Sequence, residues 1–150
     1  MYKALDIAKK LLLTAKRDCE LEGRGEYMST MKLQKMLYYE QGFHLAVFGN
    51  PLFEESIEAW MYGPVVPSVY EAYKGYGYQG IVPDDVEELS LEPKEQALFD
   101  EVYQVYSSYS AMGLMNLTHN EMPWKSTPSG LGSVISTDKM REFFLTRIND

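Results

Sequence analysis

The chain has 150 residues, 45% of them hydrophobic, and a formal net charge of −8 at pH 7. This length predicts one domain that buries about two-thirds of its unfolded surface, and the apolar content excludes a disordered chain. No run of about 18 apolar residues could span a membrane, the N-terminus has no secretory signal, and the single cysteine, Cys19, excludes a disulfide framework. We therefore expect one cytoplasmic domain over residues 1–150, without a membrane partner, a cofactor or a metal.

Charge and tyrosine are unevenly distributed along the chain. Residues 1–35 hold eight basic and five acidic residues, whereas residues 36–150 hold six basic and seventeen acidic residues. Because phosphate neutralisation needs clustered Lys and Arg, the strong overall acidity argues against nucleic acid as a partner. Seven of the 12 tyrosines lie between residues 38 and 78, which makes that stretch unusual.

Two long helices are predicted in the N-terminal third. Over residues 2–20, apolar side chains recur every three or four positions, which is typical of a helix with one buried stripe. Ser29 or Thr30 is suited to cap a second helix over residues 31–48, whose apolar side chains face almost every direction. Such a helix belongs in the middle of a domain, and Gly42 within it predicts a close approach by another element.

The middle of the chain predicts a small β element and a short helix. Residues 52–60 alternate loosely between apolar and polar side chains, as in a hairpin or an extended pair. The Gly-Pro pair at 63–64 then predicts a turn, and Pro67 can occupy the first position of a short helix over residues 67–73. Tyrosines alternate with glycines over residues 75–80, which predicts a loop.

Further helices are predicted in the C-terminal half. Residues 93–109 keep the apolar spacing of a helix, and Ser110 can cap a shorter helix through residue 117. Residues 123–132 predict a loop before a final helix that begins near residue 136. Four apolar residues of that helix share one face: Met140, Phe143, Phe144 and Ile148. The predicted fold is mainly α, a compact single-domain helical bundle around a central apolar helix, with a small β-hairpin.

Catalytic residues are sought first at the two histidines. His44 lies four residues after Glu40 on one face of the predicted central helix, so a carboxylate–imidazole pair is geometrically possible. Together with His119 these residues are the candidates for a small hydrolase or transferase, but a structural polar pair is the favoured interpretation. The chain has no nucleotide-binding, esterase or zinc-protease motif, and we predict no enzyme activity.

The aromatic residues give a stronger signal, and it indicates binding. Tyrosine and tryptophan supply a large apolar area with a polar tip at low entropic cost, which is why they anchor interfaces. The segment Trp60–Pro67 joins aromatics to rigid proline turns, although each ring could instead fill the core. The acidic segment 84–101, with eight carboxylates and one lysine, either attracts a basic partner or forms a solvated face.

Four sequence blocks, taken in order, resemble a known family. The blocks read L-Q-K-M-L-Y-Y at 33–39, G-N-P-L-F at 49–53, E-A-W-M-Y-G-P-V at 58–65, and T-H followed by P-W between 118 and 124. They resemble the L-Q-K-L-L-Y-Y, G-x-P-L-F, E-A-W…x-G-P-V and T-H…P-W motifs of the Panacea domain, the SocA-like antitoxin family also described as phage-associated protein. No single motif is unique, but the set is specific and spans most of the chain.

The resemblance implies a mostly helical domain without catalysis that neutralises a toxin protein by direct contact. It also implies that the toxin is encoded by the adjacent gene, often on a prophage, and that a cytoplasmic protease is a further partner of some members. Many relatives carry an added helix-turn-helix. We expect no such separate DNA-binding domain within residues 1–150, and the acidic charge favours the same expectation.

We therefore predict an antitoxin that binds its cognate toxin. One alternative is a protease adaptor or a phage–host interaction protein without its own toxin, and another is a small hydrolase that uses Glu40, His44 and His119. The residues predicted to contact the partner are two lysines at the start of the central helix and six aromatic residues: Lys32, Lys35, Trp60, Tyr62, Tyr70, Tyr73, Tyr76 and Tyr78.

Overall fold

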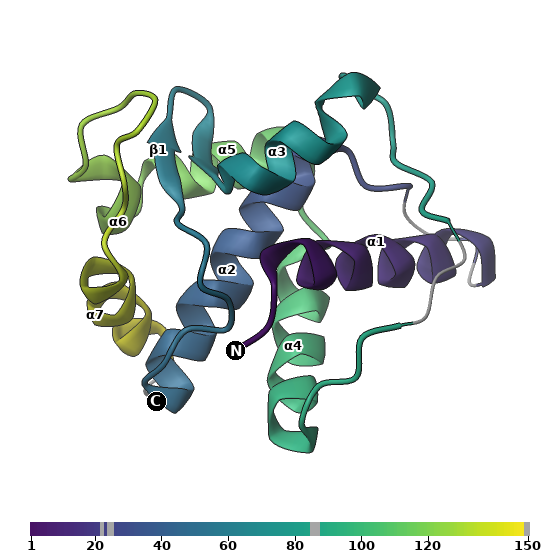
Figure 1. Cartoon of the computed structure of the whole chain (residues 1–150), viewed down its shortest axis with the longest axis horizontal. Helices are drawn as coiled ribbons and strands as arrows, with labels where there is room; N and C mark the ends of the chain where they lie inside the picture. Colours follow the sequence, from purple (N-terminus) through teal and green to yellow (C-terminus); the bar gives the residue numbers. More distant parts are fainter. Residues whose placement is uncertain (22, 24–25, 85–87, 149–150) are drawn as a thin grey trace.

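The chain folds mainly into helices joined by irregular segments (Figure 1). The computed structural model describes residues 1–21, 23, 26–84 and 88–148. Within them lie the helices α1 (Ala4–Leu21), α2 (Thr30–Phe48), α3 (Pro67–Tyr73), α4 (Pro93–Tyr106), α5 (Ala111–His119), α6 (Met122–Lys125) and α7 (Thr137–Ile148), the 3-10 turn η1 (Lys74–Tyr76), and the strands β1 (Glu58–Trp60) and β2 (Gly63–Val65). The predicted mainly α bundle with a small β-hairpin is confirmed. None of the described helices is long and apolar enough to cross a lipid bilayer.

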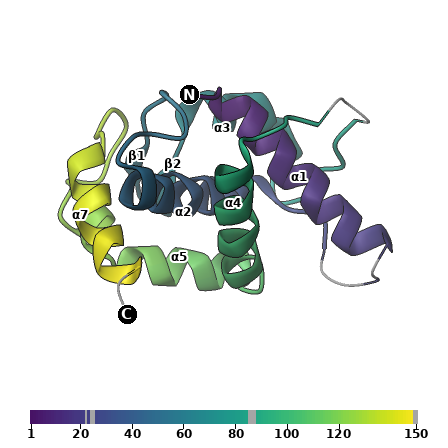
Figure 2. The same cartoon turned by 90° about the horizontal axis from the view of Figure 1, so that it is seen from below.

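Helix α2 lies in the centre of the molecule, as its apolar residues predicted. Figures 1 and 2 show it crossing the domain, and α1, α3, α4, α5, α7 and β2 all pack against it. Ser29 caps the first turn by accepting a hydrogen bond from the backbone N–H of Lys32. Gly49 ends the helix in the left-handed conformation, with a φ of 79°. These two caps fix the ends of the element around which the core is assembled.

Gly42 is the position at which α7 packs into α2. A Cβ atom at this position would lie 2.1 Å from Cε2 of Phe144, so no side chain fits there unless that ring moves. The ring of Phe144 lies with its centroid 5.3 Å from that of Tyr38 and 4.8 Å from that of Phe43. The close approach predicted at Gly42 is therefore confirmed, and the element that approaches is the buried face of the last helix.

Helix α1 uses part of its basic charge within the molecule. Lys10 is buried, donates a hydrogen bond of 2.8 Å to the carbonyl oxygen of Leu89, and lies 3.4 Å from the carboxylate of Glu88. Arg17 donates two hydrogen bonds of 3.0 Å to the same carboxylate. The basic first helix and the acidic segment thus neutralise each other in part. Residues 85–87 of that segment lie outside the described residues.

The β-hairpin lies later in the chain than the sequence analysis placed it. β1 pairs antiparallel with β2, with Ala59 opposite Pro64 and Trp60 opposite Gly63. The Gly-Pro pair predicted as a turn therefore belongs to a strand, and residues 61–62 make the turn. Residues 52–57 form no regular strand in the structure.

Hydrogen bonding explains why a proline is tolerated in β2. The N–H of Ala59 donates to the carbonyl oxygen of Ser133, and the carbonyl oxygen of Ala59 accepts from the N–H of Gly130, each at 2.8 Å. Both backbone groups of Ala59 thus point away from β2, so Ala59 and Pro64 form a pair without hydrogen bonds. The missing N–H of Pro64 removes no ladder bond, and β2 lies at the edge of the sheet.

Two other boundaries differ from the prediction. Residues 122–125 form α6 where a loop was predicted, because Pro123 is accepted in a first turn that does not need its N–H. Helix α4 ends at Tyr106 rather than at residue 109, and Ser110 caps α5 as predicted by accepting a hydrogen bond from the N–H of Gly113. The predicted loop after α3 begins with the 3-10 turn η1.

Two buried glutamines of α2 hold the hairpin region in place. Gln41 accepts a hydrogen bond of 2.7 Å from the N–H of Leu52 and donates one of 2.8 Å to the carbonyl oxygen of Phe53. Gln34 accepts a bond of 2.9 Å from the N–H of Val66, directly before α3. Each amide satisfies backbone groups of an irregular segment, as buried backbone requires. The start of α3 is thereby fixed against α2, and this positions the pocket described next.

Candidate protein-binding site

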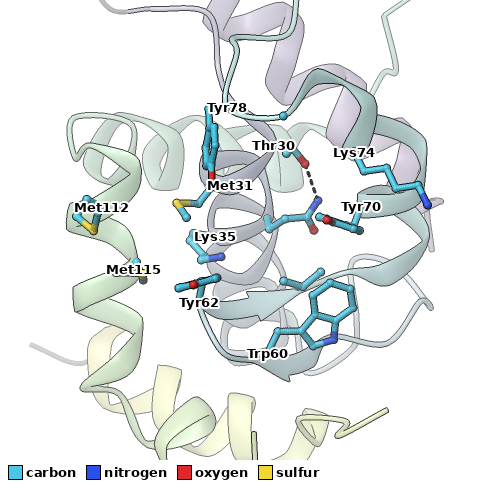
Figure 3. Close-up of a pocket in the computed structure, with 13 residues that line it drawn as sticks. Thr30, Met31, Lys35, Trp60, Tyr62, Tyr70, Lys74, Tyr78, Met112 and Met115 are labelled. Carbon is cyan, nitrogen blue, oxygen red and sulfur yellow. Dashed lines mark hydrogen bonds between the residues drawn. The ribbon is translucent and has the colours of Figure 1, made fainter. Parts of the chain in front are cut away.

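A pocket of about 600 Å³ lies between α2, the β-hairpin, the α3–η1 segment and α5. This volume is in the range of sites that accept a small ligand or a partner side chain. The lining is mostly apolar, with aromatic and methionine side chains from all four segments. The residues that line it are Thr30, Met31, Gln34, Lys35, Trp60, Tyr62, Val65, Tyr70, Lys74, Gly77, Tyr78, Met112 and Met115 (Figure 3).

Lys35 is the most unusual of these residues. It projects from α2, only 1% of its surface is exposed, and its amine points into the pocket (Figure 3). Within the described part of the chain, its amine makes no hydrogen bond and no ion pair. Burial lowers the pKa of this amine to about 7, because an ammonium ion loses hydration in an apolar environment. A buried lysine without a counterion is costly, so this side chain requires an explanation.

The hairpin makes room for this lysine. A Cβ atom at Gly63 would lie 2.6 Å from Cε of Lys35, and Gly63 has a φ of 114°, a conformation that other residues rarely adopt. Glycine is therefore needed in β2 for two reasons. It adopts this backbone conformation without strain, and it leaves space for the aliphatic part of the Lys35 side chain. This explains the glycine at the start of β2.

Aromatic rings form one wall and the rim of the pocket. Trp60 and Tyr70 meet edge to face, with ring centroids 5.1 Å apart. The indole N–H of Trp60 donates to Glu58 at 2.9 Å, which holds the ring in place. Tyr62 is 59% exposed and Tyr78 is 94% exposed, so both offer apolar surface to a partner. Exposed aromatic residues beside a pocket are the composition found at the centre of protein interfaces.

Three of the predicted contact residues do not line the pocket. Lys32 donates a hydrogen bond of 2.7 Å to the carbonyl oxygen of Ser107, which ties α2 to the end of α4, and burial lowers its pKa. Tyr73 and Tyr76 contact each other, with ring centroids 6.3 Å apart, and burial raises the pKa of Tyr73. The other five predicted residues come together in the pocket: Lys35, Trp60, Tyr62, Tyr70 and Tyr78.

Sequence reasoning missed the methionine wall of the pocket. Met112 and Met115 lie three residues apart on α5, and Met31 lies at the start of α2. Methionine is flexible and polarisable, and it is common on surfaces that adapt to partners. The spacing of three on a short helix was the available signal, but only the fold brings α5 beside the hairpin. Lys74, also missed, pairs with Glu71 at 2.7 Å on the outside of α3.

The candidate catalytic residues do not form a site. His44 contacts Glu95 of α4, with Nε2 2.6 Å from the carboxylate, and its Nδ1 lies 2.7 Å from the carbonyl oxygen of Asn50. The predicted pair with Glu40 is therefore wrong, because α4 supplies a closer carboxylate. Glu40 is buried and its Oε2 has no partner among the described residues, and burial raises the pKa of that carboxyl well above its usual range.

His119 lies apart from that pair, at the end of α5. Its ring stacks on Trp124, with centroids 4.0 Å apart, and burial lowers the pKa of the imidazole. The indole N–H of Trp124 in turn donates to the carbonyl oxygen of Trp60 at 2.8 Å. This histidine thus belongs to the packing between α5, α6 and the hairpin. Among the described residues no group of three or more His, Cys, Asp or Glu side chains is arranged to hold a metal ion.

Comparison with known proteins shows the family of this chain. Residues 33–125, from α2 through α6, match the family model described as antitoxin SocA-like, Panacea domain. The match covers more than half of the chain. The chain belongs to the Panacea domain family. Helices α1 and α7 lie outside the matched residues.

The chain is also similar in sequence to a curated protein. The chain is 29% identical over 118 residues to a protein named antitoxin SocA from Caulobacter vibrioides (strain NA1000 / CB15N). The alignment covers 71% of this chain and 63% of the relative, so about a third of the relative has no counterpart in the alignment. No solved structure matches the chain.

Most of the signature of this Panacea domain serves the core. Tyr38 and Tyr39 are fully buried, and their hydroxyls donate hydrogen bonds of 3.0 Å to the two carboxylate oxygens of Glu121. Burial raises the pKa of Glu121 to about 7, although the two hydroxyls oppose this effect. Five residues of the signature blocks also line the pocket: Gln34, Lys35, Trp60, Tyr62 and Val65. The family blocks therefore build one wall of the candidate site as well as the core.

Proposed function

We propose that this protein is an antitoxin that neutralises a cognate toxin by direct protein–protein binding, and that the pocket face is the contact surface. Membership of the Panacea domain family supports the antitoxin role. The exposed aromatic and methionine side chains around the pocket support the choice of surface. The toxin is expected from the adjacent gene, and both proteins act in the cytoplasm under this proposal.

The observation that carries the choice of surface is the exposure of Tyr62 and Tyr78 at the rim of a pocket. Large exposed apolar residues that converge on one concave site typically mark an interaction site. Neither hydroxyl makes a hydrogen bond within the described residues, and most of each side chain is exposed. Their removal should therefore affect binding much more than stability.

Co-expression with the adjacent gene tests the antitoxin role. The adjacent gene alone should stop growth, and this protein should restore it and co-purify with the product. The double variant Tyr62→Ala, Tyr78→Ala should lose rescue and weaken binding by roughly a hundredfold, since interface anchors are each worth about 1–2 kcal/mol or more. Tyr109→Ala is the matched control, because Tyr109 is also exposed but lies outside the pocket.

The results distinguish the antitoxin from the adaptor alternative. A harmless adjacent gene, or growth arrest that this protein leaves unchanged, contradicts the antitoxin role. Capture of a protease or a host enzyme without the adjacent gene product would instead favour an adaptor or a phage–host interaction protein. Full rescue by the double tyrosine variant would keep the antitoxin role but move the contact surface elsewhere.

A further inference from the structure

The inference starts from the environment of Lys35. Its side chain crosses from α2 to the hairpin, contacts Gly63, and ends in the pocket with its three N–H donors unused by the described residues. None of the described residues that line the pocket is acidic, in a chain that has 22 acidic residues. Within residues 1–21, 23, 26–84 and 88–148, the amine of Lys35 belongs to no ion pair. The described residues therefore leave this amine free to pair with a group of a partner that enters the pocket.

We propose that the pocket receives the carboxylate of an aspartate or glutamate side chain of a partner protein, which pairs with the amine of Lys35. A carboxylate carries one negative charge, so one buried lysine neutralises it. A phosphate would bring up to two charges and several further acceptors into a pocket whose walls are mostly apolar. The aromatic and methionine walls then contact the apolar atoms that lie next to the carboxylate.

Two tyrosines provide further hydrogen-bond donors. The hydroxyls of Tyr62 and Tyr70 make no hydrogen bond within the described residues, and both side chains line the pocket with Lys35. Figure 3 shows the hydroxyl end of Tyr70 directed toward the pocket. A carboxylate has about four lone-pair sites, more than a single amine satisfies. The lysine and a hydroxyl can therefore share the two oxygens, which gives a charge-assisted site with a defined orientation.

The distribution of charge around the pocket indicates which kind of partner surface fits it. The protein as a whole carries a net charge of −8, which disfavours an acidic partner over most of its surface. The pocket is a local exception, with Lys35 inside and Lys74 at its edge, although Lys74 is already paired with Glu71. A single acidic residue that projects from an otherwise neutral or basic partner surface fits this distribution. Such a contact adds specificity, since an uncharged side chain would leave the lysine buried and unpaired.

Two small molecules of the same shape test the site without any knowledge of the partner. Phenylacetate and phenylacetamide are titrated into the full-length protein by NMR at constant ionic strength and about pH 6.5, where much of the amine is protonated. Phenylacetate should bind roughly tenfold or more tightly than the amide, and it should shift the signals of Lys35 and of the hairpin. Equal binding of the two compounds, or binding of neither, overturns the proposal.

A pair of variants locates the effect at the amine. Lys35→Met keeps the length of the side chain but removes its charge, and it should reduce the preference for phenylacetate to about unity. Lys94→Met is the control, because Lys94 is exposed at the start of α4 outside the pocket, and it should keep the preference. A preference that survives Lys35→Met overturns the proposal. The comparison of acid and amide on the wild-type protein stands even if this variant folds poorly.

The assignment of the carboxylate to a toxin rests on the proposed function, and its test separates the two. If Tyr62→Ala with Tyr78→Ala weakens toxin binding but Lys35→Met does not, the carboxylate site is wrong and the antitoxin role stands. If phenylacetate binds as expected but the adjacent gene product does not bind, the antitoxin role is wrong and the site stands. With both correct, replacing one acidic residue of the toxin by its amide should remove the effect of Lys35→Met in a double-mutant cycle.

Discussion

At Lys35, the binding role that we propose is expected to come at a cost in folding stability. The side chain of this lysine is buried and its amine lies in a mostly apolar pocket, so the folded protein should be less stable than it would be with an uncharged side chain of the same length. Residues kept despite such a cost are commonly those that act on a ligand. The effect on stability can be measured separately from binding, and the pKa of the amine fixes its pH dependence.

Lys35→Met is expected to raise the free energy of unfolding by roughly 3 kcal/mol near pH 6.5. The folded-state pKa of about 7 lies below the ordinary value of 10.5, so between these values the unfolded chain binds more protons and wild-type stability rises with pH. The advantage of the variant should therefore be largest below pH 7 and shrink toward about pH 10. Urea unfolding of both proteins across this range measures it. An advantage that does not change with pH would contradict the burial of the charge.

Glu121 is expected to give the opposite pH dependence. Its folded-state pKa of about 7 lies above the ordinary value of 4.5, so between these values the folded protein binds more protons and stability falls as pH rises. Relative to that of Glu121→Gln, the free energy of unfolding of the wild type should fall by roughly 2 kcal/mol between about pH 5 and pH 8. Thermal or urea unfolding at both pH values provides the measurement. Glu142→Gln on the exposed face of α7 should show no such difference.

At the scale of the elements, the contact between α2 and α7 depends on one missing side chain. Gly42→Ala should favour an isolated helix by about 1 kcal/mol. In the protein, Gly42→Ala should instead lower the free energy of unfolding by roughly 1–3 kcal/mol, because the new methyl group would overlap Phe144. Urea unfolding measures the net effect. Adding Phe144→Leu should recover part of the loss in Gly42→Ala, and a Gly42→Ala protein that is more stable than wild type would refute this account.

Most helices could be predicted from the sequence because apolar residues recur along each of them with the spacing of a helix. Ser110 was correctly predicted as a cap, Ser29 was one of the two cap candidates for α2, and Gly42 was correctly predicted as a contact point, since each has a local physical cause. The hairpin was misplaced because its register depends on bonds from Ala59 to residues 130 and 133, far away in sequence. Local alternation of apolar and polar residues carries no information about such partners.

At the scale of the whole molecule, the family signature does not contain everything that α2 requires. Helices α1 and α7 cover two sides of α2 yet lie outside the residues that match the family model. A helix that is apolar on all sides needs neighbours on all sides, or its exposed face destabilises the domain. The residues that match the family model are therefore fewer than those that pack around α2 in the fold.

Removal of residues 137–150 is expected to abolish cooperative unfolding. Without α7, the rings of Tyr38 and Phe43 lose the contact with Phe144 and become accessible to solvent. Thermal unfolding followed by circular dichroism should become broad, and the truncated protein should bind a hydrophobic dye. Arg141→Ala, an exposed change in the same helix, should leave the transition sharp. A truncated protein with a sharp, unchanged transition would show that α7 is dispensable.

The candidate site was only partly predictable, because it is assembled from four distant segments. Trp60, Tyr62, Tyr70 and Tyr78 could be proposed from aromatic clustering alone. The burial of Lys35, the exclusion of Lys32 and the contribution of α5 follow from how α2 is rotated in the core, which is set by α4 and α7 on its other sides. Such a rotation is a property of the whole domain.

The indole arrangement at the hairpin has a practical consequence for studying this protein in solution. Trp60 and Trp124 are the only tryptophans of the chain, and the second donates a hydrogen bond to the backbone of the first. Trp60 also lines the pocket and touches Tyr70. The tryptophan fluorescence of the unlabelled protein, excited selectively, therefore originates at the hairpin and at the neighbouring α6. A molecule that enters the pocket should alter the emission intensity or wavelength, so occupancy can be followed optically in real time and without chemical modification.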